Sequence, residues 1–168
     1  MVATIGYERA SLRDFIATLE LCGIDVLVDI RDRAQSRRPG FSKSALSDAL
    51  AEAGISYIHI RELGDPKEGR EAARRGDYDQ FRAIFSSVMA SNEAKEAIST
   101  LERLASERSI CLMCFERDYT TCHRKIVADH LEATLDRKAQ HLGVKEGAGR
   151  RSTVRRVPGA HQGATASV

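Results

Sequence analysis

Hydrophobic residues along the chain fall into short apolar runs separated by longer amphipathic stretches. Short runs rich in Val, Ile and Leu predict strands. The predicted strands are VATIGY (2–7), IDVLVDI (24–30), ISYIHI (55–60) and SICLMCF (109–115), with AQHLGV (139–144) as a candidate fifth. Helical spacing of apolar residues predicts helices. The predicted helices are 11–23, 42–54, most of 67–108 with a break at RRGD, and one that begins near residue 122.

The order of these elements predicts an α/β fold. The run at 24–30 is apolar except at Asp25 and Asp29, a pattern typical of a strand buried on both faces of a parallel sheet. Strands that alternate with helices predict three layers, an open and mostly parallel sheet flanked by helices. We expect one such domain over residues 1–146, followed by a basic tail rich in Gly, Ala and Arg at 147–168.

Composition and charge narrow the class of protein. The 168 residues are 42% hydrophobic and 30% charged, as in globular domains. No apolar run reaches the roughly 18 residues of a membrane span, so no membrane partner is expected. The start lacks the layout of a signal peptide and the four cysteines are too few for a disulfide framework, so we expect a cytoplasmic protein. Residues 137–168 carry a net charge of +6 and the preceding part −4, and disorder is expected beyond about residue 147.

Polar residues follow four of the predicted strands. In open α/β sheets, ligands bind in the crevice beyond the carboxyl ends of the strands. The sequence therefore predicts one ligand site at this edge. The residues expected to line it are Tyr7, Glu8, Arg9, Arg31, Asp32, His59, Arg61, Glu116 and Arg117.

Three basic residues begin the predicted helix near residue 122, in CHRKIVADHL. His123, Arg124 and Lys125 stand at the positive end of the helix dipole, which disfavours each cation by about 0.3 to 1 kcal/mol. Free N–H groups at a helix start bind anions, so an anionic ligand held with the help of Arg124 would account for the cations. The alternative is a structural ion-pair network with Glu116 and Asp118 in the preceding loop.

The cysteines allow two kinds of chemistry. Cys122 stands beside His123 and Arg124 at a helix start, an environment that lowers the pKa of a thiol and favours a nucleophile. A packing role for Cys122 is the preferred alternative. Cys111 and Cys114 have C-x-x-C spacing but point to opposite faces of a strand. Cys114, Cys122 and His123 could still converge on zinc across the loop, although no metal is assigned.

A second basic segment, RDRAQSRRPGFSK (31–43), leaves the strand at 24–30. Pro39 and Gly40 make it a loop rather than a helix face. A solvated loop is the ordinary interpretation of such a segment. Because it begins at the ligand edge, we favour a functional loop in which Arg31 and Arg37 bind phosphate or carboxylate.

Four ordered blocks carry a family resemblance. TIGY (4–7), LVDIR (27–31) with SRRPGFSK, GISYIHIRELGDPK (54–67) and LMCFERDYTTCHR (112–124) together resemble the bacterial and archaeal family catalogued as domain of unknown function 488. The resemblance runs over about residues 2–145 and implies a cytoplasmic α/β domain without an established reaction. It places family positions at Arg31, Ser36, Arg37, Glu116, Cys122, His123 and Arg124. Many relatives have proline where this chain has Ala34.

Together these features predict an enzyme, a hydrolase or group transferase, for a nucleotide, nucleic acid or other phosphate-bearing substrate. Glu116 would serve as general acid or base, and the base role is favoured because a carboxylate among arginines normally stays ionised. The expected catalytic residues are Glu116, Cys122 and His123, and the expected substrate-binding residues are Tyr7, Arg31, Ser36, Arg37, His59 and Arg124. No cofactor is assigned, since the chain has no Walker loop, G-x-G-x-x-G or G-x-S-x-G. The alternatives are a non-catalytic nucleic-acid-binding module and a thiol- or metal-dependent regulatory protein.

Overall fold

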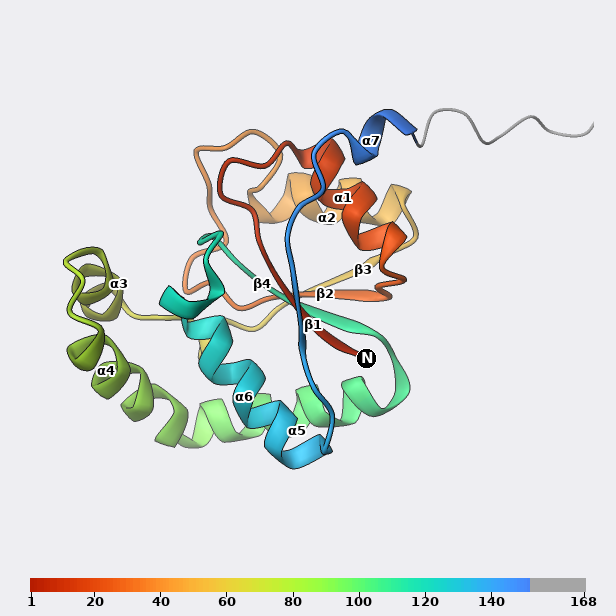
Figure 1. Cartoon of the computed structure of the whole chain (residues 1–168). Coiled ribbons are helices and arrows are strands. Elements are labelled where there is room, and N and C mark those ends of the chain that lie inside the picture. The colour runs from red at the N-terminus through yellow and green to blue at the C-terminus, as the bar shows by residue number, and fades with distance from the viewer. Residues whose placement is uncertain (152–168) are drawn as a thin grey trace, which may run out of the picture.

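Five parallel strands form one sheet in the order β3-β2-β4-β1-β5 (Figure 1). The computed structural model describes residues 1–151. The strands are β1 (Val2–Gly6), β2 (Val26–Asp29), β3 (Ser56–His59), β4 (Ile110–Cys114) and β5 (Gln140–Leu142). Ile110 of β4 lies opposite Val2 on one side and Val26 on the other, which fixes the register of the three central strands. The predicted parallel sheet is confirmed, including its fifth strand.

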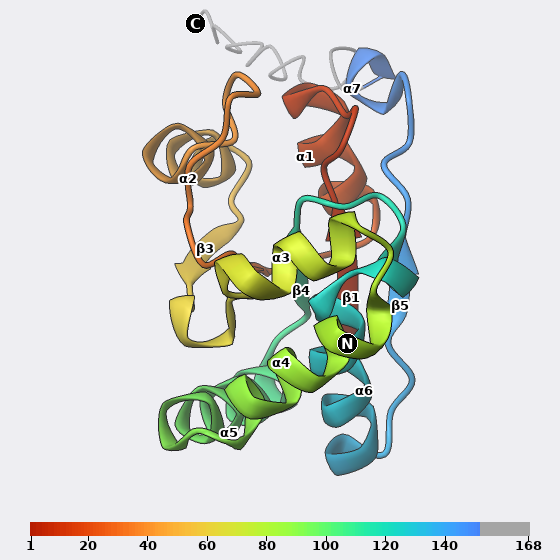
Figure 2. The same cartoon turned by 90° about the vertical axis from the view of Figure 1, so that its left-hand side faces the viewer.

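Helices cover both faces of the sheet, so the predicted three layers are also confirmed. In Figure 1, α1, α2 and α7 lie above the sheet and α5 and α6 below it. In Figure 1, α3 and α4 project to the left of the sheet, and in Figure 2 they face the viewer. The helices are α1 (Leu12–Leu21), α2 (Lys43–Glu52), α3 (Lys67–Arg74), α4 (Tyr78–Ala90), α5 (Asn92–Glu107), α6 (His123–Leu135) and α7 (Ala148–Arg151), with short 3-10 helices at Arg61–Leu63 and Tyr119–Thr121.

Local sequence signals account for the helix boundaries. The Ser11 side chain accepts a hydrogen bond from the Asp14 amide and caps α1, as its spacing predicts. The helix break predicted at RRGD lies at Gly76, between α3 and α4. Gly76 has a φ of 76°, a backbone conformation that interrupts a helix. Asp77 then caps α4 by accepting from the Gln80 amide, a role for which aspartate is well suited.

The core consists of two clusters, one on each face of the sheet. Alternate residues of a strand point to opposite faces, so Val26 and Val28 join the cluster under α4, α5 and α6. Leu27 and Met113 join the cluster under α1 and α2. All of these side chains are buried. Burial of both faces explains why the β2 and β4 runs are apolar without alternation.

The predicted tail begins with an ordered turn. Within the segment predicted as a basic tail, α7 packs on α1, and the Gly149 amide donates to Oδ1 of Asp14 over 3.0 Å. The onset of disorder predicted near residue 147 therefore does not hold for α7. Residues 152–156 of the basic cluster RRSTVRR (150–156) lie outside the described residues. No helix among residues 1–151 is long and apolar enough to cross a bilayer.

Candidate functional site

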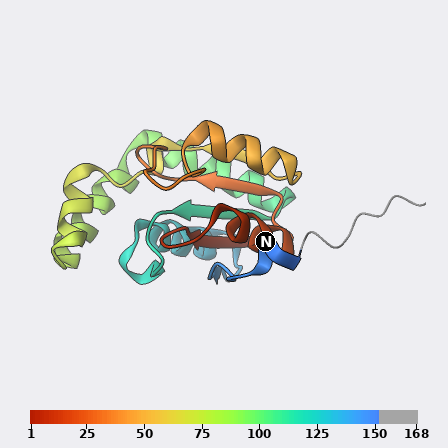
Figure 3. The same ribbon diagram turned by 90° about the horizontal axis from the view of Figure 1, so that it is seen from above.

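A cavity of about 860 Å³ opens beyond the carboxyl ends of β1, β2 and β4. Figure 3 shows these strands side by side and pointing toward α3 and α4, and two arginines of α3, Arg70 and Arg74, line the cavity. Its walls come from the end of β1, the loop after β2, Asp65, α3 and the loop after β4. The predicted site residues that line it are Tyr7, Arg31, Ser36, Arg37, Glu116 and His123. His59, Cys122 and Arg124 do not line it.

The cavity is strongly basic. Seven arginines line it against the four acids Glu8, Asp32, Asp65 and Glu116. Several of the arginines are engaged within the fold: Arg70 pairs with Asp32 over 3.2 Å, and Arg38 donates to the carbonyl oxygen of Ala10. Four others, all exposed, make no side-chain hydrogen bond or ion pair within residues 1–151. These four are Arg9, Arg33, Arg37 and Arg74.

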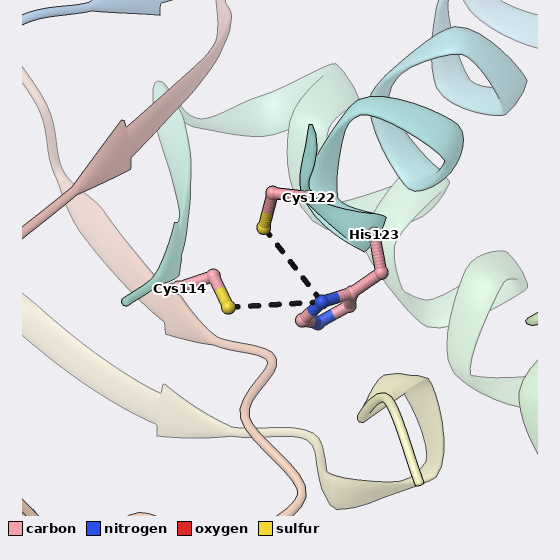
Figure 4. Close-up of side chains that lie close together, drawn as sticks. All are labelled: Cys114, Cys122 and His123. Atoms are coloured by element: carbon pink, nitrogen blue, oxygen red, sulfur yellow. Dashed lines mark hydrogen bonds between the residues drawn. The ribbon is translucent and has the colours of Figure 1, made fainter. Parts of the chain in front are cut away.

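Cys114, Cys122 and His123 converge at the edge of this cavity (Figure 4). Cys114 ends β4, Cys122 is the N-cap of α6 and His123 is its first residue. Nδ1 of His123 lies 3.6 Å from Sγ of Cys114 and 3.7 Å from Sγ of Cys122. All three side chains are buried. On the other side of the ring, Nε2 lies 2.9 Å from the carbonyl oxygen of Ile30. Nε2 carries the hydrogen, because a carbonyl can only accept.

The cluster has an asymmetric charge distribution in the absence of a metal. Burial raises the pKa of the Cys114 thiol well above its usual value. Burial acts on Cys122 in the same direction, but the neighbouring Cys114 side chain and the charge of His123 outweigh it and hold the pKa of Cys122 well below its usual value. Burial lowers the pKa of His123, and the Cys122 thiolate raises it to about 9. The direction of the Cys122 shift is the one expected of an activated thiol, whereas its exposure of 2% is that of a packing residue.

Glu116 adds a carboxyl group to the cluster. Sγ of Cys114 donates to Oε2 of Glu116 over 3.1 Å. Burial and the nearby Cys122 thiolate raise the pKa of Glu116 to about 7. This direction opposes the ionisation that the sequence led us to expect of a carboxylate among arginines. The reason is orientation, because the carboxyl group faces the cysteines, and Arg124 contacts the backbone of Glu116 instead.

Arg124 has a structural position rather than the predicted anion-binding one. Its side chain is 1% exposed. Nη1 donates to the carbonyl oxygen of Glu116, and Nη2 donates to that of Arg117 over 3.1 Å. The guanidinium thus holds the loop after β4 against the start of α6. This loop also lies on β1, since a Cβ at Gly6 would be 1.8 Å from the Glu116 carbonyl oxygen.

Arg31 reaches the cavity through a buried polar network. Nε and Nη2 donate to the two carboxylate oxygens of Asp29 over 2.8 and 2.6 Å, and Nη1 donates to the Tyr7 hydroxyl over 2.9 Å. The Tyr57 hydroxyl donates to Asp29 over 2.5 Å. Burial alone would lower the pKa of Arg31, but Asp29 raises it above its usual value. Three of its five N–H groups are used, which leaves two for a ligand.

The other two predicted contacts, His59 and Ser36, act on the loop after β2. Nε2 of His59 lies 2.8 Å from the Arg31 carbonyl oxygen and donates to it. Oγ of Ser36 accepts from the Arg38 amide over 3.1 Å. His59 supports the start of the loop from outside the cavity, whereas Ser36 shapes the cavity wall.

Asp65 is a cavity residue that the sequence prediction missed. Its side chain is 5% exposed, and Oδ1 has no hydrogen-bond partner within residues 1–151. Burial raises the pKa of Asp65 to about 6, although the positive charges of His123 and Arg70 act to lower it. A Cβ at Gly69 would lie 2.0 Å from Oδ1, so α3 can approach this carboxyl group only through a glycine. The dipeptide GD at 64–65 was present in the third resemblance block, but nothing in the pattern placed it at the cavity.

The buried carboxyl group of Asp65 should make stability depend on pH. Its folded pKa of about 6 lies above the ordinary 3.8, so between these values the folded state holds more protons and stability falls as the pH rises. We expect Asp65→Asn to be more stable than wild type by about 1 to 2 kcal/mol near pH 7.5 and to lose this advantage near pH 4. Urea unfolding of both proteins across this range, with a chelator present, measures the difference. An advantage of constant size would mean that ionisation of Asp65 is not its cause.

Comparison with known proteins identifies the family to which the chain belongs. No curated protein and no solved structure matches the chain significantly. The family model described as "Domain of unknown function DUF488" matches residues 11–131. This match covers most of the sheet, the loop after β2 and the Cys114–Cys122–His123 cluster, and it agrees with the resemblance seen in the sequence blocks. The chain therefore belongs to the DUF488 family.

Proposed function

We propose that the protein is an enzyme, a hydrolase or group transferase, that binds a phosphate-bearing substrate in the cavity of about 860 Å³. One observation carries this proposal: four arginines without a side-chain partner in the described part of the chain share the cavity with a thiol, an imidazole and a carboxyl group. Arginine presents N–H groups in the fork that matches phosphate oxygens. Ionisable groups with shifted pKa values in a cleft are typical of reaction centres.

Different residues of the cavity wall are assigned to substrate binding and to catalysis. Arg33 and Arg37 on the loop after β2 hold the phosphate, and Arg31 contributes its two free N–H groups. Phe115, which is 42% exposed, lies edge-on to Tyr7 at the cavity wall with 5.4 Å between ring centroids. An exposed ring beside a phosphate site suits the stacking of a base, so a nucleotide or nucleic acid is the preferred class of substrate.

Glu116 is the proposed acid or base. It lines the cavity beside Cys114 and His123, within reach of a bound substrate. A positioned carboxyl group contributes about 10²- to 10⁴-fold to a rate through proton transfer. Cys122 does not line the cavity, so its proposed role is to set the charge of the cluster rather than to attack the substrate.

The experiment measures binding and turnover on a panel of nucleoside phosphates and short oligonucleotides. We expect the double variant Arg33→Ala with Arg37→Ala to weaken binding by about tenfold or more, because charge-assisted hydrogen bonds to phosphate are lost. Glu116→Gln should keep the binding and lose most of the turnover. The matched control is Arg82→Ala with Arg103→Ala, which removes the same charge from α4 and α5.

Two results would contradict this proposal. Equal loss of binding in the cavity variant and in the control would indicate general attraction by net charge. Tight binding without turnover of any substrate would leave a second candidate, a non-catalytic nucleic-acid-binding module, which the exposed unpaired arginines also favour. Such a module should show a log-log salt dependence of about −0.7 to −0.9 for each phosphate contacted.

A further inference from the structure

We propose that Cys114, Cys122 and His123 bind a zinc ion through their two sulfurs and Nδ1. Tetrahedral zinc has Zn–S bonds of about 2.3 Å and Zn–N bonds of about 2.0 to 2.1 Å, which place sulfur and nitrogen ligands about 3.6 Å apart. The two sulfur-to-Nδ1 distances are 3.6 and 3.7 Å. All three atoms lie within 4.8 Å of one another.

A hydrogen-bonded cluster explains this arrangement less well than a cation does. In the plane of the ring Nδ1 has either one lone pair or one hydrogen, so it cannot form hydrogen bonds of good geometry with both sulfurs in either protonation state. Figure 4 shows both sulfurs directed at this same nitrogen. A single cation between the three atoms satisfies all of them at once.

The hydrogen bond on the other side of the His123 ring is one that metal-binding histidines form. Metal-bound imidazoles almost always donate their other N–H to a carbonyl or carboxylate, which fixes the tautomer and the ring. Here Nε2 of His123 donates to the carbonyl oxygen of Ile30 over 2.9 Å, which leaves the Nδ1 lone pair for the metal. Ile30 directly follows β2, so the ring is fixed against the sheet.

Charge and ligand type select the ion. Two thiolates and a neutral imidazole balance the charge of a divalent cation, so the ion and its three ligands together are neutral. Thiolate and imidazole ligands favour zinc over magnesium or calcium, which prefer oxygen. The three ligands come from the end of β4 and the start of α6, elements whose positions the core fixes.

The fourth position of this zinc site faces the cavity. Cys114, His123 and Glu116 all line the cavity, and Oε2 of Glu116 lies 3.1 Å from Sγ of Cys114. A site with three protein ligands that opens on a cleft is typical of catalytic zinc, which activates a bound water. Water activation, with Glu116 as proton acceptor, rests on the proposed function, whereas metal binding rests on the geometry alone.

The test is the metal content of the reduced, full-length protein after equilibration with zinc and a weak chelator. We expect one zinc per chain, and a loss of affinity of at least about 100-fold in Cys122→Ser and in His123→Ala. The matched control is Cys22→Ser, a cysteine on the far end of α1, which should keep the metal. Cobalt substituted into the wild-type protein should give the thiolate charge-transfer and d–d bands of a tetrahedral site, a readout that needs no variant to fold.

Two outcomes overturn the zinc site. The first is a wild-type protein that binds neither zinc nor cobalt while its thiols are reduced. The second is an equal loss of metal in Cys22→Ser and in Cys122→Ser. The proposed function fails separately. Zinc-loaded protein that binds and turns over no phosphate ligand would contradict that function and leave the metal site in place. Phosphate binding by metal-free protein would support the arginine cavity even where no zinc binds.

Discussion

Asp29→Ala is expected to lower the free energy of unfolding by about 3 to 5 kcal/mol, because it leaves the buried charge of Arg31 without its partner. Asp29 is fully buried and accepts from two nitrogens of Arg31 and from the Tyr57 hydroxyl. The matched control is Asp79→Ala, which breaks the exposed pair with Arg82 and should cost less than about 1 kcal/mol. Urea denaturation measures both.

A second variant tests the cause of this loss. If the cost arises from a stranded charge, Asp29→Ala combined with Arg31→Met should be more stable than Asp29→Ala alone, since an apolar replacement of a buried pair is often neutral. A double variant that is less stable than the single one would assign the loss to packing instead. The single variant should also free the Arg31 guanidinium to bind anions in the cavity.

Arg124→Met is expected to destabilise the fold by about 2 to 4 kcal/mol, because two carbonyl groups lose charge-assisted hydrogen bonds. Relief of the dipole penalty returns only about 0.3 to 1 kcal/mol. Methionine keeps much of the side-chain volume, so the loss reports on the contacts to Glu116 and Arg117. The neighbouring Lys125→Met, which removes an exposed pair with Asp129, should cost about 0.5 kcal/mol or less.

Urea unfolding without ligand distinguishes a structural role of Arg124 from an anion-binding role. A lower midpoint at unchanged slope for Arg124→Met, and not for Lys125→Met, would match the structural position of Arg124. An unchanged midpoint together with lost phosphate binding would return Arg124 to the anion-binding role expected from the sequence. The cations at this helix start would then serve a ligand rather than the loop.

The sequence predicted the sheet well because its strands are buried on both faces. Val26, Leu27 and Val28 are apolar in succession, which is the pattern of a central parallel strand, and all three are buried. The strand-end rule then placed Tyr7, Arg31 and Glu116 at one edge, and all three line the cavity. A pattern along the chain suffices for these residues because each directly follows a strand.

The direction of a side chain at the start of a helix could not be predicted in the same way. The helix begins at His123 with Cys122 as its N-cap, which turns His123 toward the cavity and Arg124 toward the loop after β4. A start one residue earlier would turn each side chain by about 100° around the helix axis, so His123 would no longer face the cavity. The exposed arginine of α3, Arg74, was missed for another reason: α3 lies outside the sheet, and no rule of strand order places it.

The strand order has a consequence for how the chain folds. β4 lies between β1 and β2, so pairing at the centre of the sheet joins residues 2–6 to residues 110–114. Before β4 is synthesised, β2 and β3 can form only their own pair. Such distant parallel pairing follows the closure of a long loop and is intrinsically slow. Because β4 also carries Cys114 and leads into α6, its insertion joins the centre of the sheet and brings in the Cys114–Cys122–His123 cluster, and a nascent chain that has not reached this point has neither.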